Sequence, residues 1–285
     1  MTDTSAAAPV NLPIGIFDSG VGGLTVLRAL QAVLPHENFL YLGDTARVPY
    51  GTRSPETVRR YARQASALLF SRGIKALVVA CNTASAAALD ALRGDHPETL
   101  IEGVIEPGAR AAHVATRVAH VAVIATEGTV AGGAYPRALA ILNQSLRVEQ
   151  RACPLLVALA EEGWTNGPVV DGVLQRYLDG LFPPDGADVL VLGCTHFPVL
   201  ADAIRAAVPP SVRLVDSAAT TATVVAEDLA ARGLRRMQGG SNVHFLVTDN
   251  PGRFERTAAN FLGAAPAHGA IELVDINDAS LPGRP

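Results

Sequence analysis

Short apolar runs alternate with amphipathic stretches along most of the chain. The apolar runs, which predict strands, span residues 14–17, 39–42, 76–80, 101–105, 121–125, 189–192, 213–215 and 244–247. Between them, helical periodicity appears at residues 24–34, 55–72, 84–92 and 198–206. Strands that are apolar on both faces need helices on both sides. The pattern therefore predicts an α/β fold with mainly parallel sheets flanked by helices.

The two halves of the chain repeat one layout. Residues 14–26 (IGIFDSGVGGLTV) and 120–133 (HVAVIATEGTVAGG) each contain a strand, a small polar turn and a glycine-rich entry to a helix. Each half also has, near its end, a strand that leads into a turn with a cysteine. We therefore predict two similar α/β domains. The first is discontinuous and comprises residues 12–105 and 216–276, the second comprises residues 106–215, and residues 1–11 and 277–285 are expected to be flexible tails.

Two of the three cysteines lie in similar settings. Cys81 follows the apolar run of KALVVACNTAS, Cys194 follows that of DVLVLGCTHFP, and a threonine comes within two residues of each. A lone cysteine at a strand end is usually a small buried apolar residue, and Cys153, which precedes Pro154, is interpreted in that way. The repetition in two half-chains instead favours chemistry that needs a thiol on each side of a ligand.

Composition narrows the class of protein. The chain has 285 residues, of which 49% are hydrophobic and 18% charged, and its formal net charge is −4. A nucleic-acid partner is not expected, because such a surface needs clustered basic residues and the arginines here are scattered. The first residues do not resemble a signal peptide, and no apolar stretch reaches the length of a membrane span. We therefore expect a cytoplasmic protein that does not contact a membrane.

The same counts restrict cofactor chemistry. Lys75 is the only lysine, so a pyridoxal cofactor would have to form its Schiff base there. A lysine at the start of a strand usually extends to solvent, which argues against that role. The cysteines do not form a disulfide framework, and no CxxC or HxxxH spacing indicates a metal site. The counts therefore argue against a pyridoxal cofactor and against a metal site.

Polar residues follow the predicted strands at the places where α/β proteins bind ligands. Ligands bind beyond the carboxyl ends of parallel strands, where helix N-termini favour carboxylates and phosphates. The residues at these ends are Asp18, Ser19, Cys81, Asn82, Thr83, Thr126, Cys194, Thr195 and His196. Their hydrogen-bond donors predict a site for a small anion, such as an amino acid.

The two thiols could then act as nucleophiles or as acid–base groups. If they face one carbon from opposite sides, one can remove a proton while the other delivers a proton to the opposite face, which inverts the centre. Asp18 and His196 are candidate partners that accept or tune the thiol protons. The α-proton of an amino acid is far less acidic than a thiol. The site must therefore stabilise the developing negative charge.

Several of these features also have simpler interpretations. Asp18 could cap the next turn, and His196 could be a hydrogen-bonded core residue. Tyr50-Gly51 could belong to a plain polar loop, and the two glutamates at 161 and 162 to a solvated helix end. The GVGG segment at residues 20–23 is similar to a dinucleotide-binding loop, but it lacks the full GxGxxG spacing.

Seven segments carry a resemblance to a known family. In chain order they are GIFDSGVGGLTVLRAL, YLGDTARVPYGTRS, VVACNTASA, GVIEPGA, VIATEGTV, ACPLLVALAEEGW and VLGCTHFPVL. Together they resemble the glutamate racemases of the cofactor-independent aspartate/glutamate racemase superfamily. The resemblance implies two α/β domains with the active site in the cleft between them, and no cofactor. It also implies an isomerase that interconverts L- and D-glutamate and supplies D-glutamate for peptidoglycan synthesis, and so for cell wall biogenesis and cell shape.

The resemblance also assigns roles to single residues. It makes Cys81 the thiol that deprotonates the D-isomer and Cys194 the thiol that deprotonates the L-isomer. The assisting acid–base residues that it implies are Asp18, Glu161 and His196, although Glu162 offers a second registration for Glu161. The implied substrate-binding residues are Asp18, Ser19, Tyr50, Gly51, Asn82, Thr83, Thr126, Thr195 and His196. Members of the family commonly dimerise, so a homodimer is expected.

Two other functions remain open on the sequence. The first is a related enzyme with another substrate, such as an aspartate racemase, an isomerase or a decarboxylase. Two thiols disfavour a decarboxylase, because protonation of one face needs only one, and the segments GVIEPG and DTARVPYG favour glutamate. The second is a non-catalytic two-domain module that binds a small solute, which would give no reason to place two thiols in its cleft.

Overall fold

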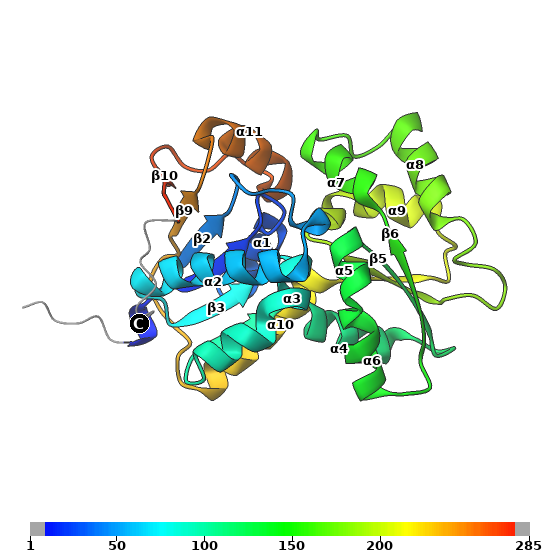
Figure 1. Ribbon diagram of the computed structural model, residues 1–285, viewed down its shortest axis with the longest axis horizontal. Helices are drawn as coiled ribbons and strands as arrows, with labels where there is room; N and C mark the ends of the chain where they lie inside the picture. The colour runs from blue at the N-terminus through cyan, green and yellow to red at the C-terminus, as the bar shows by residue number, and fades with distance from the viewer. Residues whose placement is uncertain (1–8, 277–285) are drawn as a thin grey trace, which may run out of the picture.

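The structure, a computed structural model, describes residues 9–276 of the chain. In this part of the chain two sheets of parallel strands lie side by side, each flanked by helices (Figure 1). The expected α/β fold class is therefore confirmed. The predicted tails are covered only in part, since residues 1–8 and 277–285 lie outside the described residues. Pro9–Asn11 (η1), which were expected to belong to a flexible tail, form a short 3₁₀ helix.

The first sheet has the strand order β10-β9-β2-β1-β3-β4. Its strands are β1 (Ile14–Asp18), β2 (Phe39–Gly43), β3 (Ala76–Val79), β4 (Leu100–Gly103), β9 (Val243–Val247) and β10 (Ile271–Leu273). Ile14 and Ile16 of β1 pack on the side of α1 (Leu24–Val33), α10 (Ser217–Ala231) and α11 (Pro251–Leu262). Phe17 faces the opposite side, which is covered by α2 (Pro55–Ser71) and α3 (Asn82–Asp95). This alternation is the two-residue period of a strand that is buried on both faces.

The second sheet has the strand order β6-β5-β7-β8. Its strands are β5 (His120–Ala125), β6 (Arg147–Ala152), β7 (Val189–Gly193) and β8 (Arg213–Asp216). The helices on one side are α4 (Ile105–Ala115), α5 (Glu127–Gly132) and α6 (Ala134–Leu142) (Figure 1). The other side is covered by α7 (Pro154–Glu161), α8 (Pro168–Leu178), α9 (Ala201–Ala207) and the 3₁₀ segment η3 (Phe197–Leu200). Burial of β5 and β7 on both faces places them at the centre of this half.

The two sheets share one topology. β1 lies between β2 and β3 in the first sheet, and β5 lies between β6 and β7 in the second. In each case the chain visits one neighbour of the central strand and then crosses to the other, which creates the switch point where α/β sheets bind ligands. Cys81 follows β3 and Cys194 follows β7, so the repeated layout expected from the sequence is confirmed. The domain ranges 12–105 with 216–276, and 106–215, stay a prediction.

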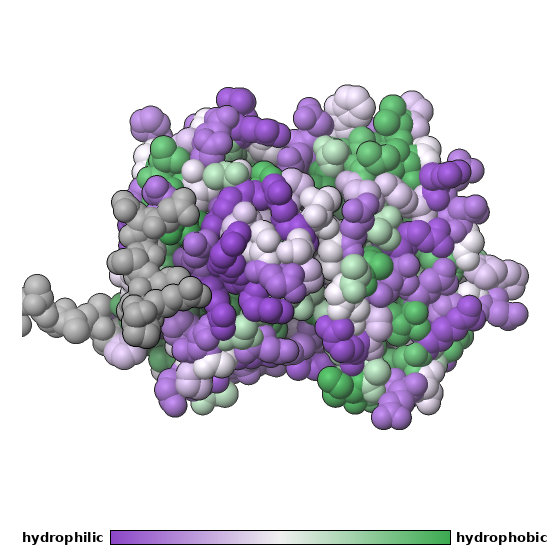
Figure 2. Space-filling model, in the orientation of Figure 1, coloured by the Kyte–Doolittle hydropathy of each residue, from purple (hydrophilic) through white to green (hydrophobic). Residues whose placement is uncertain are grey.

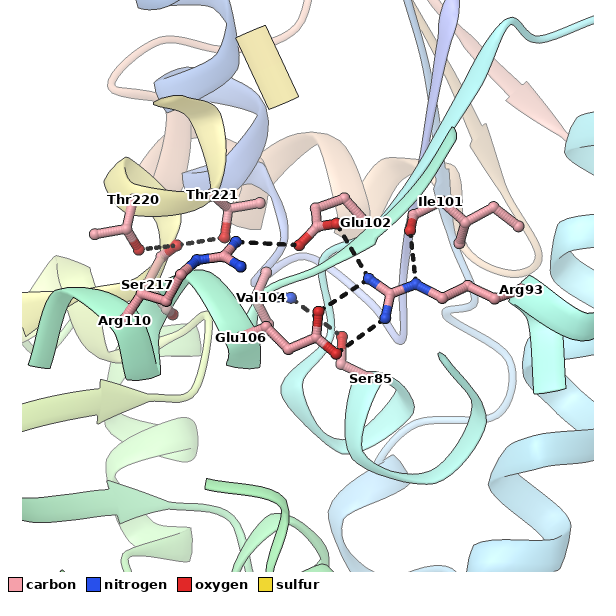
Figure 3. Close-up of polar contacts among 10 residues, drawn as sticks. All are labelled: Ser85, Arg93, Ile101, Glu102, Val104, Glu106, Arg110, Ser217, Thr220 and Thr221. Carbon is pink, nitrogen blue, oxygen red and sulfur yellow. Dashed lines mark hydrogen bonds and ion pairs between the residues drawn. The ribbon is translucent and has the colours of Figure 1, made fainter. Parts of the chain in front are cut away.

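Charged side chains surround the first crossing between the sheets, from β4 to α4. Arg93 of α3 contacts Glu102 at the end of β4 (3.1 Å) and Glu106 of α4 (2.9 Å) (Figure 3). Arg110, one turn further along α4, lies 4.0 Å from the other oxygen of Glu102. Burial raises the pKa of Glu102 to about 6, although Arg93 acts to lower it. Ion pairs therefore join elements on the two sides of the crossing, where the chain passes from one sheet to the next.

The second crossing, from β8 to α10, is fixed by hydrogen bonds instead. The Asp216 carboxylate accepts from the backbone N–H of Ala218 (2.8 Å), which caps the helix. Ser217 donates to the carbonyl of Leu192 in β7 (3.3 Å), and its own carbonyl accepts from Thr221 (2.6 Å, Figure 3). The start of α10 is thereby tied to the strand that carries Cys194.

Most predicted elements are present, with a few differences. The strand expected at residues 101–105 ends at Gly103, because Ile105 already begins α4. β6 was missed because it is a partly exposed edge strand with the polar sequence RVEQRA. β10 was missed because it has only three residues. The long helix expected from Ser54 is confirmed, since the Ser54 hydroxyl accepts the backbone N–H of Thr57 and the helix ends before Gly73.

Lys75 does not extend to solvent as expected. Its ammonium group is buried and contacts Glu37 (2.5 Å), and it also donates to the carbonyls of Val10 and Leu234. The carboxylate and two carbonyls compensate for the loss of hydration, which is why this lysine can lie inside the protein. It precedes β3, at the end of the strand opposite to Cys81.

Hydrophilic side chains cover much of the face shown in Figure 2, and hydrophobic ones are interspersed among them, including some over the half formed by the second sheet. The apolar core is continuous between the sheets, since one cluster of buried residues includes Ile16 of β1 and Val123 of β5. No helix within residues 9–276 is long and apolar enough to cross a membrane.

Candidate active site

A cavity of about 330 Å³ lies where the carboxyl ends of the two sheets meet, and both Cys81 and Cys194 line it. Most of the residues expected from the sequence line it too: Ser19, Tyr50, Gly51, Asn82, Thr83, Thr126, Glu161, Thr195 and His196. Asp18 is the exception, because it is fully buried at the end of β1 beside the cavity wall. The residues from the two half-chains therefore form one site.

Cys81 occupies the N-cap of α3. Its sulphur accepts the backbone N–H of Ala84 at 3.4 Å, so the thiol points along the first turn of the helix. Burial raises the pKa of the Cys81 thiol to about 12, and the nearby Asp18 carboxylate adds to the effect. The N–H of Ala84 and the Ser19 side chain oppose it. A neutral thiol that can donate a proton is the form that these surroundings favour.

Asp18 is buried behind the cavity wall in the first half of the site. One carboxylate oxygen accepts the backbone N–H of Gly20 at 2.8 Å, and the other is buried without a partner among the described residues. Burial raises the pKa of this carboxyl, whereas His196 and the turn N–H groups act to lower it. The charge of Asp18 therefore acts on Cys81 of the first half and on His196 of the second.

Cys194 lies in different surroundings. Its sulphur is 3.7 Å from Nδ1 of His196, and Nε2 of the same ring is 3.2 Å from a carboxylate oxygen of Glu161. Burial alone would lower the pKa of His196, but the contacts with Cys194 and Glu161 outweigh it and raise the pKa to about 10. The imidazolium form is therefore favoured, and its charge stabilises negative charge on the sulphur.

The two adjacent glutamates, Glu161 and Glu162, lie in different surroundings. Glu161 lines the cavity, contacts His196, and has its second oxygen 3.7 Å from Arg253 of α11. The hydrogen bond from His196 lowers the pKa of Glu161, so the carboxylate is the favoured form. Glu162 is exposed, and no contact joins it to His196. Of the two, only Glu161 is placed to assist the Cys194 side.

Hydroxyl groups join the two halves of the chain at the cavity wall. Thr83 of α3 and Thr126 at the start of α5 lie 2.9 Å apart through their Oγ1 atoms, and Thr129 is within 3.2 Å of both. Tyr50, whose hydroxyl bonds to Asp44, is buried but lines the cavity, so it is more than a loop residue. A Cβ on Gly51 would collide with Thr126, which explains the glycine there.

The GVGG segment at residues 20–23 packs the two halves of the chain together. A Cβ on Gly22 would collide with Nδ1 of His196 and Oγ1 of Thr195. Thr25 donates at 3.0 Å to the carbonyl of Thr195, across the boundary between the sheets. The glycines therefore allow the close approach of the Cys194 segment to β1 and α1, which explains them by packing.

Sequence reasoning missed two residues that contribute to this site. Thr25 was not singled out, although it lies directly after the glycine segment. Tyr135 of α6 donates to Oδ1 of Asn82 at 2.9 Å, and no local motif marks it. As for metals, no group of three His, Cys, Asp or Glu side chains in residues 9–276 is arranged to hold an ion.

Comparisons with known proteins agree with this geometry. The sequence model of the Asp/Glu/hydantoin racemase family matches residues 24–225. The chain is 52% identical over 256 residues to the glutamate racemase of Geobacter metallireducens, and the match covers 88% of this chain and 92% of that protein. It is 48% identical over 251 residues to a glutamate racemase of Thermus thermophilus, with 88% and 92% covered.

Solved structures show the same similarity. The glutamate racemase of Thermus thermophilus in complex with β-chloro-D-alanine matches with a TM-score of 0.85 and 45% identity, over 94% of this chain and 98% of that one. The glutamate racemase of Francisella tularensis in complex with D-glutamate matches with a TM-score of 0.87 and 33% identity, over 94% and 99%. The chain therefore belongs to the Asp/Glu/hydantoin racemase family.

Proposed function

We propose that this protein is a glutamate racemase that interconverts L- and D-glutamate with two thiols and no cofactor. The observation that carries the proposal is that Cys81 and Cys194, each at the switch point of its own sheet, line one cavity. The relatives named above, two of them with ligands that are amino acids or amino acid analogues, support glutamate as the substrate.

Racemisation removes one proton from the α-carbon and adds another proton to the opposite face of that carbon. For L-glutamate, the sulphur of Cys194 as thiolate takes the α-proton, the electron pair remains on the α-carbon and its carboxylate, and the Cys81 thiol donates its proton to the opposite face. The product is D-glutamate, with Cys194 as thiol and Cys81 as thiolate. The reverse direction exchanges the two roles. Contact distances of roughly 3–3.5 Å imply sulphurs roughly 7 Å apart across a bound substrate.

The neighbouring groups suit these two roles. His196, held by Glu161, carries the positive charge that stabilises the Cys194 thiolate before the first transfer. On the other side, the N–H of Ala84 stabilises the Cys81 thiolate that forms during turnover, and Asp18 favours its reprotonation. The two sides thus begin a cycle in different protonation states.

The substrate carboxylates need hydrogen-bond donors in a cavity that excludes water. The first turn of α3 supplies backbone N–H groups and the side chains of Asn82 and Thr83. The other proposed substrate contacts are with Ser19, Tyr50, Gly51, Thr126, Thr195 and His196. Asp18 lies behind the cavity wall, where its carboxylate holds the N–H of Gly20. Two carboxylates of one small substrate fit such a donor-rich lining.

Isotope exchange tests the proposal directly. The purified protein without added cofactor should racemise L-glutamate in deuterated water, and the product should carry deuterium at the α-carbon. Circular dichroism follows racemisation, and mass spectrometry follows the label. L-aspartate assayed in parallel separates the two substrates. Faster turnover of aspartate would replace glutamate as substrate, and binding without racemisation of either would support a solute-binding module.

The cellular role is part of the same proposal. We expect a cytoplasmic homodimer that supplies D-glutamate for peptidoglycan synthesis. Depletion of the protein in its host should arrest cell wall growth, and added D-glutamate should restore it. Sedimentation equilibrium measures the oligomeric state. A monomer at all concentrations, or growth that does not respond to D-glutamate, would contradict the corresponding expectation.

A further inference from the structure

Tyr135 is a fully buried tyrosine that lies between the two thiol-bearing segments. It belongs to α6, which covers the second sheet, yet its hydroxyl donates at 2.9 Å to Oδ1 of Asn82 in α3 of the first half. Asn82 directly follows Cys81. This hydrogen bond therefore connects the second half to the residue next to the thiol of the first.

The ring of Tyr135 also touches the backbone beside the other thiol. A Cβ on Gly193, the residue before Cys194, would lie 3.0 Å from Cε2 of Tyr135. A Cβ on Gly108 of α4 would lie 3.4 Å from its hydroxyl oxygen. A larger residue at Gly193 would therefore press on the ring, whereas a Cβ at Gly108 would be in ordinary contact with the Tyr135 hydroxyl. One side chain is fitted against the neighbours of both cysteines.

The orientation of the Asn82 amide has a functional consequence. Asn82 is only 2% exposed and lines the cavity. Its oxygen is bonded to Tyr135, whereas its nitrogen Nδ2 is buried without a partner among the described residues. A buried amide N–H without a partner is unfavourable. An acceptor such as a carboxylate oxygen in the cavity would satisfy it, whereas the opposite orientation would present Oδ1 and repel a carboxylate.

We propose that Tyr135 is a positioning residue that holds the Asn82 amide with its N–H groups towards the substrate carboxylate. The inference rests on the proposed function, to which it adds a determinant of substrate binding supplied by the second half to the first. Because the Tyr135 hydroxyl bonds to Oδ1 of Asn82, the N–H groups of Asn82 are already oriented when the substrate carboxylate binds. Substrate binding then depends on a hydrogen bond that does not itself touch the substrate.

Tyr135→Phe tests this, because the ring and its packing remain and only the hydroxyl is lost. We expect KM for both enantiomers of glutamate to rise about tenfold, the effect of weakening one hydrogen bond to a charged group. The value of kcat should change less than about threefold. Tyr177→Phe is the matched control, since Tyr177 of α8 also bonds through its hydroxyl, to the N–H of Leu155, and does not line the cavity. It should keep the parent KM.

A double-mutant cycle separates positioning from a structural role. Asn82→Ala should raise KM at least as much as Tyr135→Phe, and in the Asn82→Ala background the loss of the Tyr135 hydroxyl should have little further effect. Multiplying effects would show that Tyr135 acts independently of Asn82 and would overturn the proposal. An unchanged KM in Tyr135→Phe would overturn it as well.

A readout without turnover keeps the proposal separate from the identity of the substrate. The side-chain amide signals of Asn82, assigned by their loss in Asn82→Ala, can be followed by ¹⁵N NMR in the free protein. In Tyr135→Phe these signals should shift and broaden as the amide reorients, while Tyr177→Phe leaves them in place. Unchanged signals would overturn the proposal. Failure of the parent chain to racemise glutamate would refute the proposed function and leave this measurement valid.

Discussion

Cys81 and Cys194 end equivalent strands of equivalent sheets and are almost equally buried, at 6% and 5% exposure. Their charged neighbours differ. A carboxylate, Asp18, lies near the Cys81 side and favours a neutral thiol, whereas the Cys194 side has the imidazolium of His196. A repeated topology has thus placed two identical groups, and unrelated neighbours have given them different electrostatic surroundings.

This difference between the two thiols suits the proposed mechanism. A reaction that removes a proton from one face and adds one to the other needs a base and an acid at the same moment. Two thiols in identical surroundings would tend to share one protonation state. Under the proposed mechanism, the L-to-D direction would use Cys81, whose thiol pKa is raised to about 12, as the acid and Cys194 beside His196 as the base.

The largest expected effect comes from removing either thiol. Cys81→Ala and Cys194→Ala should each reduce racemisation by roughly 10²–10⁴-fold or more, because each removes an acid–base group. Exchange without racemisation distinguishes the two: deuterium exchange into L-glutamate should survive better in Cys81→Ala, and exchange into D-glutamate better in Cys194→Ala. Cys153→Ala, a buried thiol that does not line the cavity, is the control. Full activity in either cavity variant would refute the two-thiol mechanism.

Alkylation should reveal the asymmetry in the unaltered protein. At pH 7–8 iodoacetamide should modify Cys194 more than about tenfold faster than Cys81, because thiolate is the reactive form and the pKa of Cys81 is raised to about 12. The rate at Cys81 should keep rising as the pH approaches that value. Peptide mass spectrometry measures both sites in one sample. Equal rates, or faster modification of Cys81, would contradict the comparison.

Glu161→Gln should reduce the reactivity of Cys194 and leave that of Cys81 unchanged. Without the carboxylate the pKa of His196 falls, so less imidazolium is present at neutral pH. We expect kcat with L-glutamate to fall about tenfold and the alkylation of Cys194 at pH 7–8 to become slower. Glu162→Gln, at the exposed neighbouring position, should leave both unchanged. The reverse pattern would assign the assisting role to Glu162.

The smallest effect is expected from Asp18→Asn on the reactivity of Cys81. Removing the negative charge should lower the pKa of the Cys81 thiol, since the Asp18 carboxylate helps to raise it. Alkylation of Cys81 should become roughly two- to tenfold faster at fixed pH, and that of Cys194 should not gain. Burial remains the larger cause, so Cys81 stays the slower thiol. If the rate at Cys81 does not change, Asp18 does not tune this side.

Local patterns predicted much of the fold and most of the site. Buried strands and capped helices such as α2 follow from short-range rules, so they were found with boundaries close to the observed ones. Polar residues after the strands were placed correctly, because parallel strands bring their carboxyl ends to one edge. The polar edge strand β6 and the burial of Lys75 beside Glu37 escaped prediction, since both depend on neighbours distant in sequence.

By itself, the sequence determined that two cysteines would follow two buried strands at equivalent places in a repeated α/β layout. Only the tertiary structure decided what surrounds each of them. Helix α7 brings Glu161 to His196, the glycine segment lets Thr25 reach Thr195, and α6 brings Tyr135 to Asn82. The physical reason is the distance along the chain over which each effect acts. Backbone preferences and hydrophobic periodicity act over a few residues. Charge and hydrogen bonding at the thiols depend on side chains brought together only when the two sheets pack.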